Sequence, residues 1–207
     1  MSTSFNADFE WTRAYPKAGD RPAAAYGYFD GQIRQIARGK QRYRPFASEG
    51  LYLEFADLDG SPEGCLAFAN SWGLLEKQVN VTNPPSEPVE FWRREIRRTK
   101  SLINALPGVV KFGNSRGTFA VVGELNVLLV PGDGKAASPS LVMEPKTLLQ
   151  AMNLQLALWV ARGGSIFTCE QCHKPFQAGV SGKRRSISKF CSVDCKNRHH
   201  YERRIER

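Results

Sequence analysis

The sequence predicts an α+β fold, with a mixed α/β domain over residues 1–164 and a small cysteine-rich module over residues 165–207. Three observations predict it. Segments with the two-residue period of strands and segments with helical spacing both occur before residue 164. Four of the five cysteines lie after residue 168. Two adjacent glycines, Gly163 and Gly164, separate the two regions and mark the expected boundary.

The composition is that of a folded, soluble chain. Hydrophobic residues make up 42% of the 207 residues and aromatic residues 11%, which is enough to build a packed core. The first residues lack the basic flank and apolar run of a secretory signal, and no stretch of about 18 apolar residues occurs. We therefore expect a cytoplasmic protein without a membrane span, in which thiols stay reduced.

The first half of the chain contains one expected strand. The first fifty residues show no clear period and no motif, apart from a basic stretch from Arg34 to Arg44. From residue 51 the chain places Leu51, Leu53 and Phe55 on one side of an extended backbone, which predicts a half-buried strand. The segment 59–62 follows as a turn.

A helix and a hairpin are expected next. Ser86 is the expected N-cap of a helix with apolar residues at helical spacing, and Pro107 and Gly108 mark its expected end. Residues 109–112 and 118–130 then predict two strands of a hairpin around residues 113–117.

A second helix is expected from Pro145 to Ala161. Its apolar spacing predicts that one face is buried against the core, and that face consists of Leu149, Met152, Leu156 and Trp159. The glycines at 163 and 164 end it.

The cysteines after residue 168 form two close pairs with metal-ligand spacing. Two residues separate Cys169 from Cys172, and three separate Cys191 from Cys195. Two pairs of thiolates can complete a tetrahedral shell without leaving a position for water, which is typical of a structural zinc site. The sequence therefore predicts one structural Zn²⁺ bound by these four cysteines. A pair on a turn and a pair at a helix start, where Ser192 is the expected N-cap, favour a treble-clef-like arrangement.

Other uses of these residues stay open at this point. Cys169, Cys172 and His173 also spell the c-type haem attachment motif, and four thiols can hold an iron–sulfur cluster or form two disulfides. The histidines His173, His199 and His200 could be ligands instead of a cysteine.

The tail carries most of the excess charge. Of the formal charge of +9, residues 169–207 contribute +6. Four thiolates with one divalent ion would lower this by about 2 and leave the module basic. A basic helix fixed by a metal fits the phosphates and the major groove of DNA. The residues expected to contact nucleic acid, DNA rather than RNA, are Lys183, Arg184, Arg185, Lys189, Lys196, Asn197, Arg198, His199, Arg203 and Arg204.

The segment from Phe190 to Arg198 resembles the closing part of CGNR zinc fingers, in which Cys195, Asn197 and Arg198 match the signature. Lys196 stands in place of the glycine of that signature, and Phe190 in place of its usual tryptophan. Family members are proposed bacterial transcription regulators with an N-terminal ABATE domain, and residues 53–57 resemble an early strand of that domain. The resemblance implies a transcription regulator that senses a small-molecule signal. A protein-interaction module and an RNA-associated factor are the alternatives.

No set of residues predicts an enzyme. Glu54, Asp57 and Asp59 form an acidic group that could hold an ion or belong to a solvated strand edge. The arginines between 93 and 98 favour a salt-bridged helix face over a phosphate site. Trp72, Trp92 and Trp159 could line a ligand pocket, although large residues at helical spacing are usually core.

Overall fold

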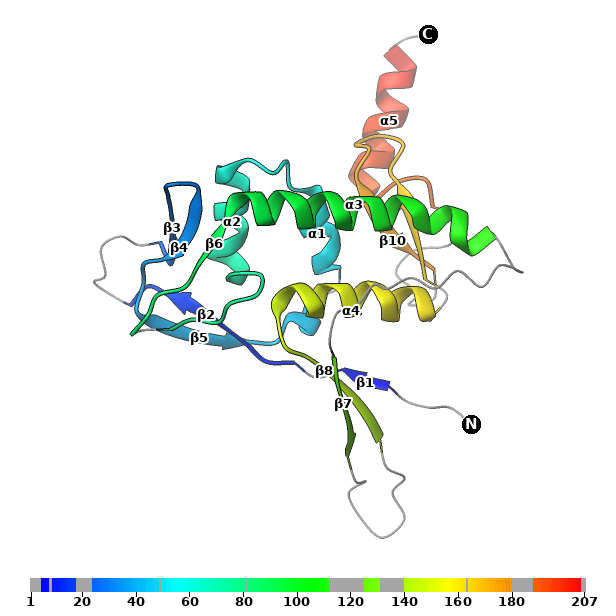
Figure 1. The fold of residues 1–207 in the computed structure, drawn as a ribbon. Coiled ribbons are helices and arrows are strands. Elements are labelled where there is room, and N and C mark those ends of the chain that lie inside the picture. The colour runs from blue at the N-terminus through cyan, green and yellow to red at the C-terminus, as the bar shows by residue number, and fades with distance from the viewer. Residues whose placement is uncertain are drawn as a thin grey trace.

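The computed structural model describes residues 5–7, 9–17, 24–48, 50–80, 82–111, 125–130, 140–162, 164–179 and 188–205. Over these residues it contains five α-helices and several small β-sheets, so the predicted mixed α+β class is confirmed (Figure 1). Among them no helix combines the length and the apolar character needed to span a membrane.

Two small antiparallel sheets form the N-terminal part. Strand β2 (Trp11–Tyr15) pairs with β5 (Gly39–Tyr43). The hairpin of β3 (Tyr26–Phe29) and β4 (Gln32–Gln35) is extended by β6 (Ser86–Pro88), which pairs with β4. A short 3₁₀ turn (Pro45–Ala47) leads from β5 to the first helix. None of these strands followed from the sequence pattern, because alternation within each runs over only three to five residues.

The expected strand at Leu51 is wrong, because Leu51–Asp57 is helix α1. Its buried residues Leu51, Tyr52, Phe55 and Ala56 recur at helical spacing. The alternation of Leu51, Leu53 and Phe55 fitted a strand only because Tyr52 and Ala56, which are also buried, were left out of the pattern. The expected turn at 59–62 leads into helix α2 (Pro62–Trp72), where the Ser61 hydroxyl accepts a hydrogen bond from the Gly64 amide at 3.0 Å.

Helices α3 (Val89–Lys111) and α4 (Leu148–Ala161) provide much of the remaining core. The second predicted helix is confirmed as α4, but it begins at Leu148 with Thr147 as its N-cap, because Pro145 is the last residue of strand β8 (Ser140–Pro145). Its expected buried face is largely confirmed too, since Leu149, Met152 and Leu156 are buried while Trp159 is half-buried.

Helix α3 differs from the prediction at both ends. Ser86 lies in β6 instead of capping the helix, and the helix continues through Pro107 to Lys111. A proline removes one backbone hydrogen bond but does not by itself unwind the turns on either side. The expected strand from residue 109 is therefore wrong as far as Lys111, and the expected turn at 113–117 lies outside the described residues.

The predicted strand ending at Val130 is confirmed over β7 (Leu125–Val130), but its partner strand is not the expected segment 109–112. Strand β7 pairs antiparallel with β8 (Ser140–Pro145), and β1 (Phe5–Ala7) joins β8 in parallel. The hairpin of β7 and β8 projects below the helices in Figure 1. It connects directly to the start of α4, which contacts β8.

The centre of the molecule is an aromatic cluster between three helices. Phe55 of α1, Phe68 of α2 and Trp92 of α3 have ring centroids 5.3 to 6.2 Å apart. Trp92 is fully buried there, so this tryptophan belongs to the core and not to a pocket. The two other tryptophans of the predicted pocket, Trp72 and Trp159, are half-buried and packed against the same core.

The charged groups singled out in the sequence are bound by protein partners. Glu95 is 5% exposed and pairs with Arg94 and Arg98, as expected for a salt-bridged helix face. Glu54 accepts a hydrogen bond from the Trp72 indole at 2.9 Å, and Asp59 accepts two from Ser61. These carboxylates therefore have protein partners, and no bound ion is needed to explain their positions.

Candidate metal centre

The first cysteine pair lies in the tight turn of a β-hairpin. Strands β9 (Ser165–Thr168) and β10 (Pro175–Ala178) pair antiparallel, and Cys169 and Cys172 occupy the turn between them. The turn is closed by hydrogen bonds from the Cys169 amide to the Lys174 carbonyl and from the His173 amide to the Cys169 carbonyl. His173 takes a positive φ of 58°, which reverses the chain so that both thiols point to the same side.

The second pair lies at the start of helix α5 (Val193–Ile205). The Ser192 hydroxyl accepts a hydrogen bond from the Cys195 amide at 3.0 Å, so the predicted N-cap is confirmed. Cys191 precedes the cap and Cys195 lies in the first turn, where Asp194 is also well placed for the helix dipole. The cap therefore fixes the second pair of thiols as the hairpin turn fixes the first.

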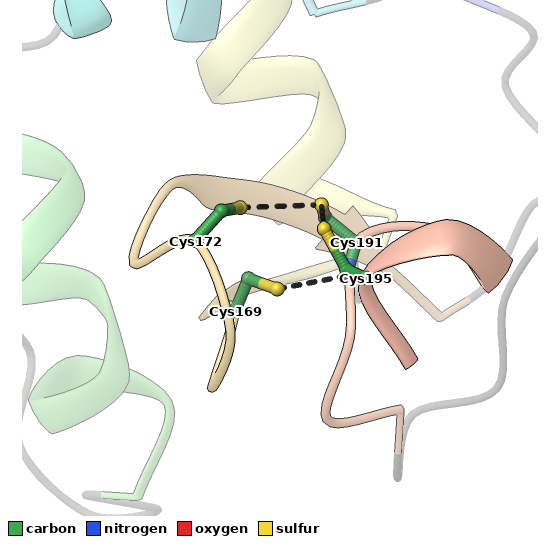
Figure 2. A group of neighbouring side chains, drawn as sticks. All are labelled: Cys169, Cys172, Cys191 and Cys195. Atoms are coloured by element: carbon green, nitrogen blue, oxygen red, sulfur yellow. Dashed lines mark hydrogen bonds between the residues drawn. The ribbon is translucent and has the colours of Figure 1, made fainter. Parts of the chain in front are cut away.

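The fold brings all four cysteines together, as Figure 2 shows. Their Sγ atoms lie within 4.8 Å of one another, with Cys191 Sγ 3.5 Å from Cys172 Sγ and 3.4 Å from Cys195 Sγ. A tetrahedral ion with metal–sulfur distances of about 2.3 Å separates its ligand sulfurs by roughly 3.8 Å. The four residues thus fit one metal ion, and no other such group occurs among the described residues.

The close packing of the sulfurs also bears on the other uses of the cysteines. All five cysteines are free, and both pairs converge on one point without forming disulfides. An iron–sulfur cluster places several atoms between its thiolates and holds them further apart than a single ion does. The geometry therefore favours a mononuclear site.

The module presents the thiols in an environment that stabilises negative charge at one of them. Burial raises the pKa of the Cys169 thiol, but backbone N–H groups of Cys172, Cys191 and Gln171 outweigh it and lower the pKa to about 6. Burial and the neighbouring thiols raise the pKa of Cys191 to about 12. One thiolate is thus available near neutral pH to bind a cation, whereas Cys191 loses its proton only when a cation is there to compensate the charge.

The module is attached to the rest of the chain through its hairpin. Lys174 Nζ lies 2.5 Å from a carboxylate oxygen of Asp57 in α1, and the Gln177 amide donates to the Tyr52 hydroxyl at 2.6 Å. Strand β9 packs on α3, and its Ile166 belongs to the main core. These contacts place the metal site beside α1 and α3, while the boundary expected at Gly163 and Gly164 stays a prediction.

Helix α5 is held mainly at one side. The Gln171 side chain, between the first two cysteines, donates to Glu202 at 2.9 Å and lies 3.2 Å from His199 Nδ1. Phe190 packs on His199 with ring centroids 5.1 Å apart. No residue of α5 within the described range is buried, and the helix projects away from the body in Figure 1.

Removing the Gln171 side chain should loosen α5 without releasing the metal. The change Gln171→Ala deletes both side-chain contacts to the helix, each worth about 1 kcal/mol net, but no metal ligand. We expect faster amide hydrogen exchange from about residue 199 onward and unchanged metal content. Gln177→Ala, which removes the contact of β10 with Tyr52 in α1, is the matched control, and equal exchange in both variants would argue against this function of Gln171.

Half of the ten residues expected to contact nucleic acid are exposed on α5. Lys196, Asn197, Arg198, Arg203 and Arg204 are exposed there. Their contact with nucleic acid stays a prediction.

The other residues of that set are placed differently. Lys189 pairs with Glu170 at 3.0 Å, and His199 is half-buried against Gln171 and Phe190. Lys183, Arg184 and Arg185 lie outside the described residues.

Comparisons with known proteins found no match to a protein-family model, a curated protein or a solved structure.

Sequence reasoning missed Gln171 and Lys174 as residues that position the module. The sequence contained part of the signal for Gln171, because its two partners His199 and Glu202 are three residues apart and so lie on one face of a helix. No comparable signal existed for Lys174, whose partner Asp57 lies 117 residues away in a segment predicted as a strand.

Proposed function

We propose that residues 165–207 form a treble-clef-like zinc finger in which Cys169, Cys172, Cys191 and Cys195 bind one structural Zn²⁺. Four thiolates that converge within 4.8 Å and leave no position for water or substrate are the usual ligand set of structural zinc. The pairing of a hairpin turn with the first turn of a helix supports the treble-clef assignment.

We further propose that the finger binds nucleic acid, with DNA as the preferred partner, through α5. One observation carries this proposal: a metal-fixed helix leaves its side chains exposed beyond the contacts to Gln171 and Phe190, and the exposed residues include the basic side chains of Lys196, Arg198, Arg203 and Arg204. Such a helix can enter a groove and neutralise phosphates. Arg203 and Arg204 in the last turn also interact favourably with the helix dipole. This interaction stabilises the helix, but it does not explain why both side chains are exposed.

The resemblance of residues 190–198 to CGNR fingers supports a more specific role, that of a cytoplasmic bacterial transcription regulator. In this role the mixed α/β N-terminal domain would respond to a small molecule and the finger would contact the operator, with no catalytic step. The contacts of Lys174 and Gln177 with α1 provide a direct connection between the two parts.

Substitution of exposed arginines on α5 tests DNA binding. We expect Arg198→Ala and Arg203→Ala each to weaken binding to a labelled duplex several-fold and to lower the slope of log K against log salt by about 0.9, because each removes one phosphate contact. Fluorescence anisotropy at several salt concentrations measures both quantities.

The control for this experiment is Arg162→Ala, which removes the same charge from an exposed position at the end of α4. Zinc content should stay at one per chain in all three variants. If Arg198→Ala and Arg203→Ala bind duplex DNA like Arg162→Ala, α5 is not the DNA-contacting helix. Tighter binding to an RNA of the same sequence would favour the RNA-associated alternative.

One observation favours the alternative of a protein-interaction module. Val193, Tyr201 and Ile205 of α5 are 72%, 65% and 67% exposed, which is unusual for apolar residues on one short helix. A partner with an apolar groove would bury them. Under this alternative Tyr201→Ala would abolish partner binding and Arg203→Ala would change it little, whereas DNA binding predicts the reverse order for a duplex.

A further inference from the structure

We propose that the β3–β4 hairpin and strand β5 form a second nucleic-acid contact, which stacks an unpaired base on Phe29 and binds the adjoining phosphates through basic side chains. This inference rests on the proposed nucleic-acid function and extends it from the finger to the N-terminal part. It assigns a use to the basic stretch that showed no motif in the sequence.

The charge in this part of the chain has one sign and lies on the surface. Residues 31–48 contain no Asp or Glu, and all five of their basic side chains are exposed in the structure: Arg34, Arg38, Lys40, Arg42 and Arg44. Four of the five are spaced two residues apart, which places Lys40 and Arg42 on one face of strand β5, with Arg38 and Arg44 just beyond its two ends. These side chains form a basic ridge along β5, similar to the positively charged grooves that follow a phosphate backbone in other proteins.

Three of these five side chains form no ion pair within the part of the chain that the structure describes. Arg42 pairs with Glu10 at 3.3 Å, but among the described residues no carboxylate forms an ion pair with Arg34, Arg38 or Lys40. Unpaired like charges close together repel one another and lower stability unless an anion binds between them. A polyanion therefore fits this surface.

An exposed aromatic ring lies beside Arg34, the first of these basic residues. Phe29 is 46% exposed, and the guanidinium of Arg34 lies 5.9 Å from its ring centroid. A side chain at position 27 would place its Cβ 2.6 Å from Cε2 of Phe29, so the ring lies against the backbone of Gly27. Gly27, Phe29 and Arg34 share one face of the hairpin, because Gly27 is the register partner of Arg34 and Phe29 lies two residues further along the same strand.

The combination of a ring, a guanidinium and adjacent cations favours an unpaired base over a duplex. Aromatic and guanidinium planes stack on the faces of bases, and those faces are accessible only where the strand is not paired. An acidic protein segment would use the cations but would leave the ring without a matching partner. The adjacent Tyr28 is 43% exposed but shares the opposite face with Ile33, so it is not part of the surface of Phe29 and Arg34.

The hairpin and the finger lie toward opposite ends of α3. The Gly31 carbonyl accepts a hydrogen bond from the Val89 amide at the start of α3, whereas the finger packs on the same helix through β9. In Figure 1 the hairpin and α5 are at opposite sides of the molecule. A helix of 23 residues spans roughly 34 Å, about one turn of duplex, so one nucleic acid with a paired and an unpaired part could contact both surfaces.

Binding of the full chain to a labelled single-stranded oligonucleotide of twenty thymidines, beside the duplex used for the finger, tests this inference. We expect Phe29→Ala to weaken single-strand binding about tenfold with an unchanged salt slope, because a stacking contact but no charge is lost. Arg34→Ala should weaken binding and lower the salt slope by about 0.7. Gly27→Ala should weaken binding without deleting any contacting group, because the new Cβ displaces the ring.

Tyr28→Ala is the matched control, since it removes a similarly exposed ring from the other face of the strand. The inference is overturned if Phe29→Ala binds the single strand like wild type, or if Tyr28→Ala loses as much affinity. The finger is tested independently, because duplex binding should respond to Arg203→Ala and stay unchanged in Phe29→Ala. Wild-type protein that binds the duplex but not the single strand would leave the finger function intact and remove the hairpin contact.

Discussion

Replacing Cys191 by serine is expected to release the metal and to unfold residues 169–207 while the rest of the chain stays folded. Loss of one thiolate from a tetrahedral structural site removes most of a binding free energy of about 10–16 kcal/mol. Helix α5 has 13 residues and no buried side chain within its described range, so it cannot persist without its metal-fixed first turn. Metal content, and hydrogen exchange of the α5 amides, measure the result.

The matched control for Cys191→Ser is the same substitution at Cys65. That thiol is fully buried in α2, far from the quartet, and burial raises its pKa to about 11. Cys65→Ser should therefore keep one metal ion per chain but lower the melting temperature of the body, because a hydroxyl is buried in an apolar site. Cys191→Ser should thus lose the metal and leave the core stable, whereas Cys65→Ser should keep the metal and destabilise the core.

The outcome for the body in Cys191→Ser decides whether the boundary at Gly163 and Gly164 is real. Unchanged melting of the body would support two units joined by the contacts of Lys174 and Gln177. Global unfolding would mean that β9, whose Ile166 belongs to the main core, makes the finger and the body one cooperative unit.

Removing the carboxylate of Glu87 should have the largest effect on the stability of the body. Glu87 is 2% exposed and accepts hydrogen bonds from the amides of Leu75, Glu76 and Lys77 at 2.9, 2.7 and 3.1 Å. These bonds fix a turn whose Leu75 carbonyl accepts from the Leu149 amide in α4. Glu87→Ala leaves three amides without their acceptor and should cost about 3 kcal/mol or more. Urea unfolding measures this loss.

Glu90→Ala is the control, because Glu90 is exposed and its pair with Arg93 is a surface salt bridge worth about 0–1 kcal/mol. Equal losses in the two variants would contradict the role of Glu87 as the acceptor that holds the turn.

The Glu87 carboxylate also makes the free energy of unfolding depend on pH, in a direction that follows from its pKa shift. Burial raises the pKa of Glu87 above its usual value of 4.5, although the three amides oppose the shift. The folded protein then binds the proton more tightly than the unfolded chain does. The contribution of Glu87 to the free energy of unfolding is therefore largest below pH 4.5 and falls as the pH rises through the raised pKa. Glu87→Gln should remove this decline, and urea unfolding across the acidic range measures it.

The sequence was most informative where spacing along the chain determines the chemistry. The grouping of the four cysteines, the Ser192 cap and most of the buried face of α4 were predicted, because each depends on residues close together in the chain. A thiol pair two residues apart can reach one ion only through a tight turn, whatever surrounds it. The signal at these positions is local and therefore visible in the sequence.

Features that depend on distant partners were not predicted. The segment at Leu51 fitted both periods, and its helical conformation depends on packing against Phe68 and Trp92 from two other helices. Glu87 has a charged side chain, and only its position beside the turn at Leu75 shows that it is buried. The contact of Phe29 with Arg34 depends on a hairpin in which Gly27 is the register partner of Arg34, and no alternation in the sequence predicted that register.

Metal analysis of the purified protein by mass spectrometry, with its visible absorption spectrum, tests most directly whether the four converging cysteines form a mononuclear zinc centre. We expect one zinc per chain and a colourless solution, since Zn²⁺ with its filled d shell has no visible absorption. Iron in the sample, or a coloured protein, would contradict it and would assign the cysteines to redox chemistry.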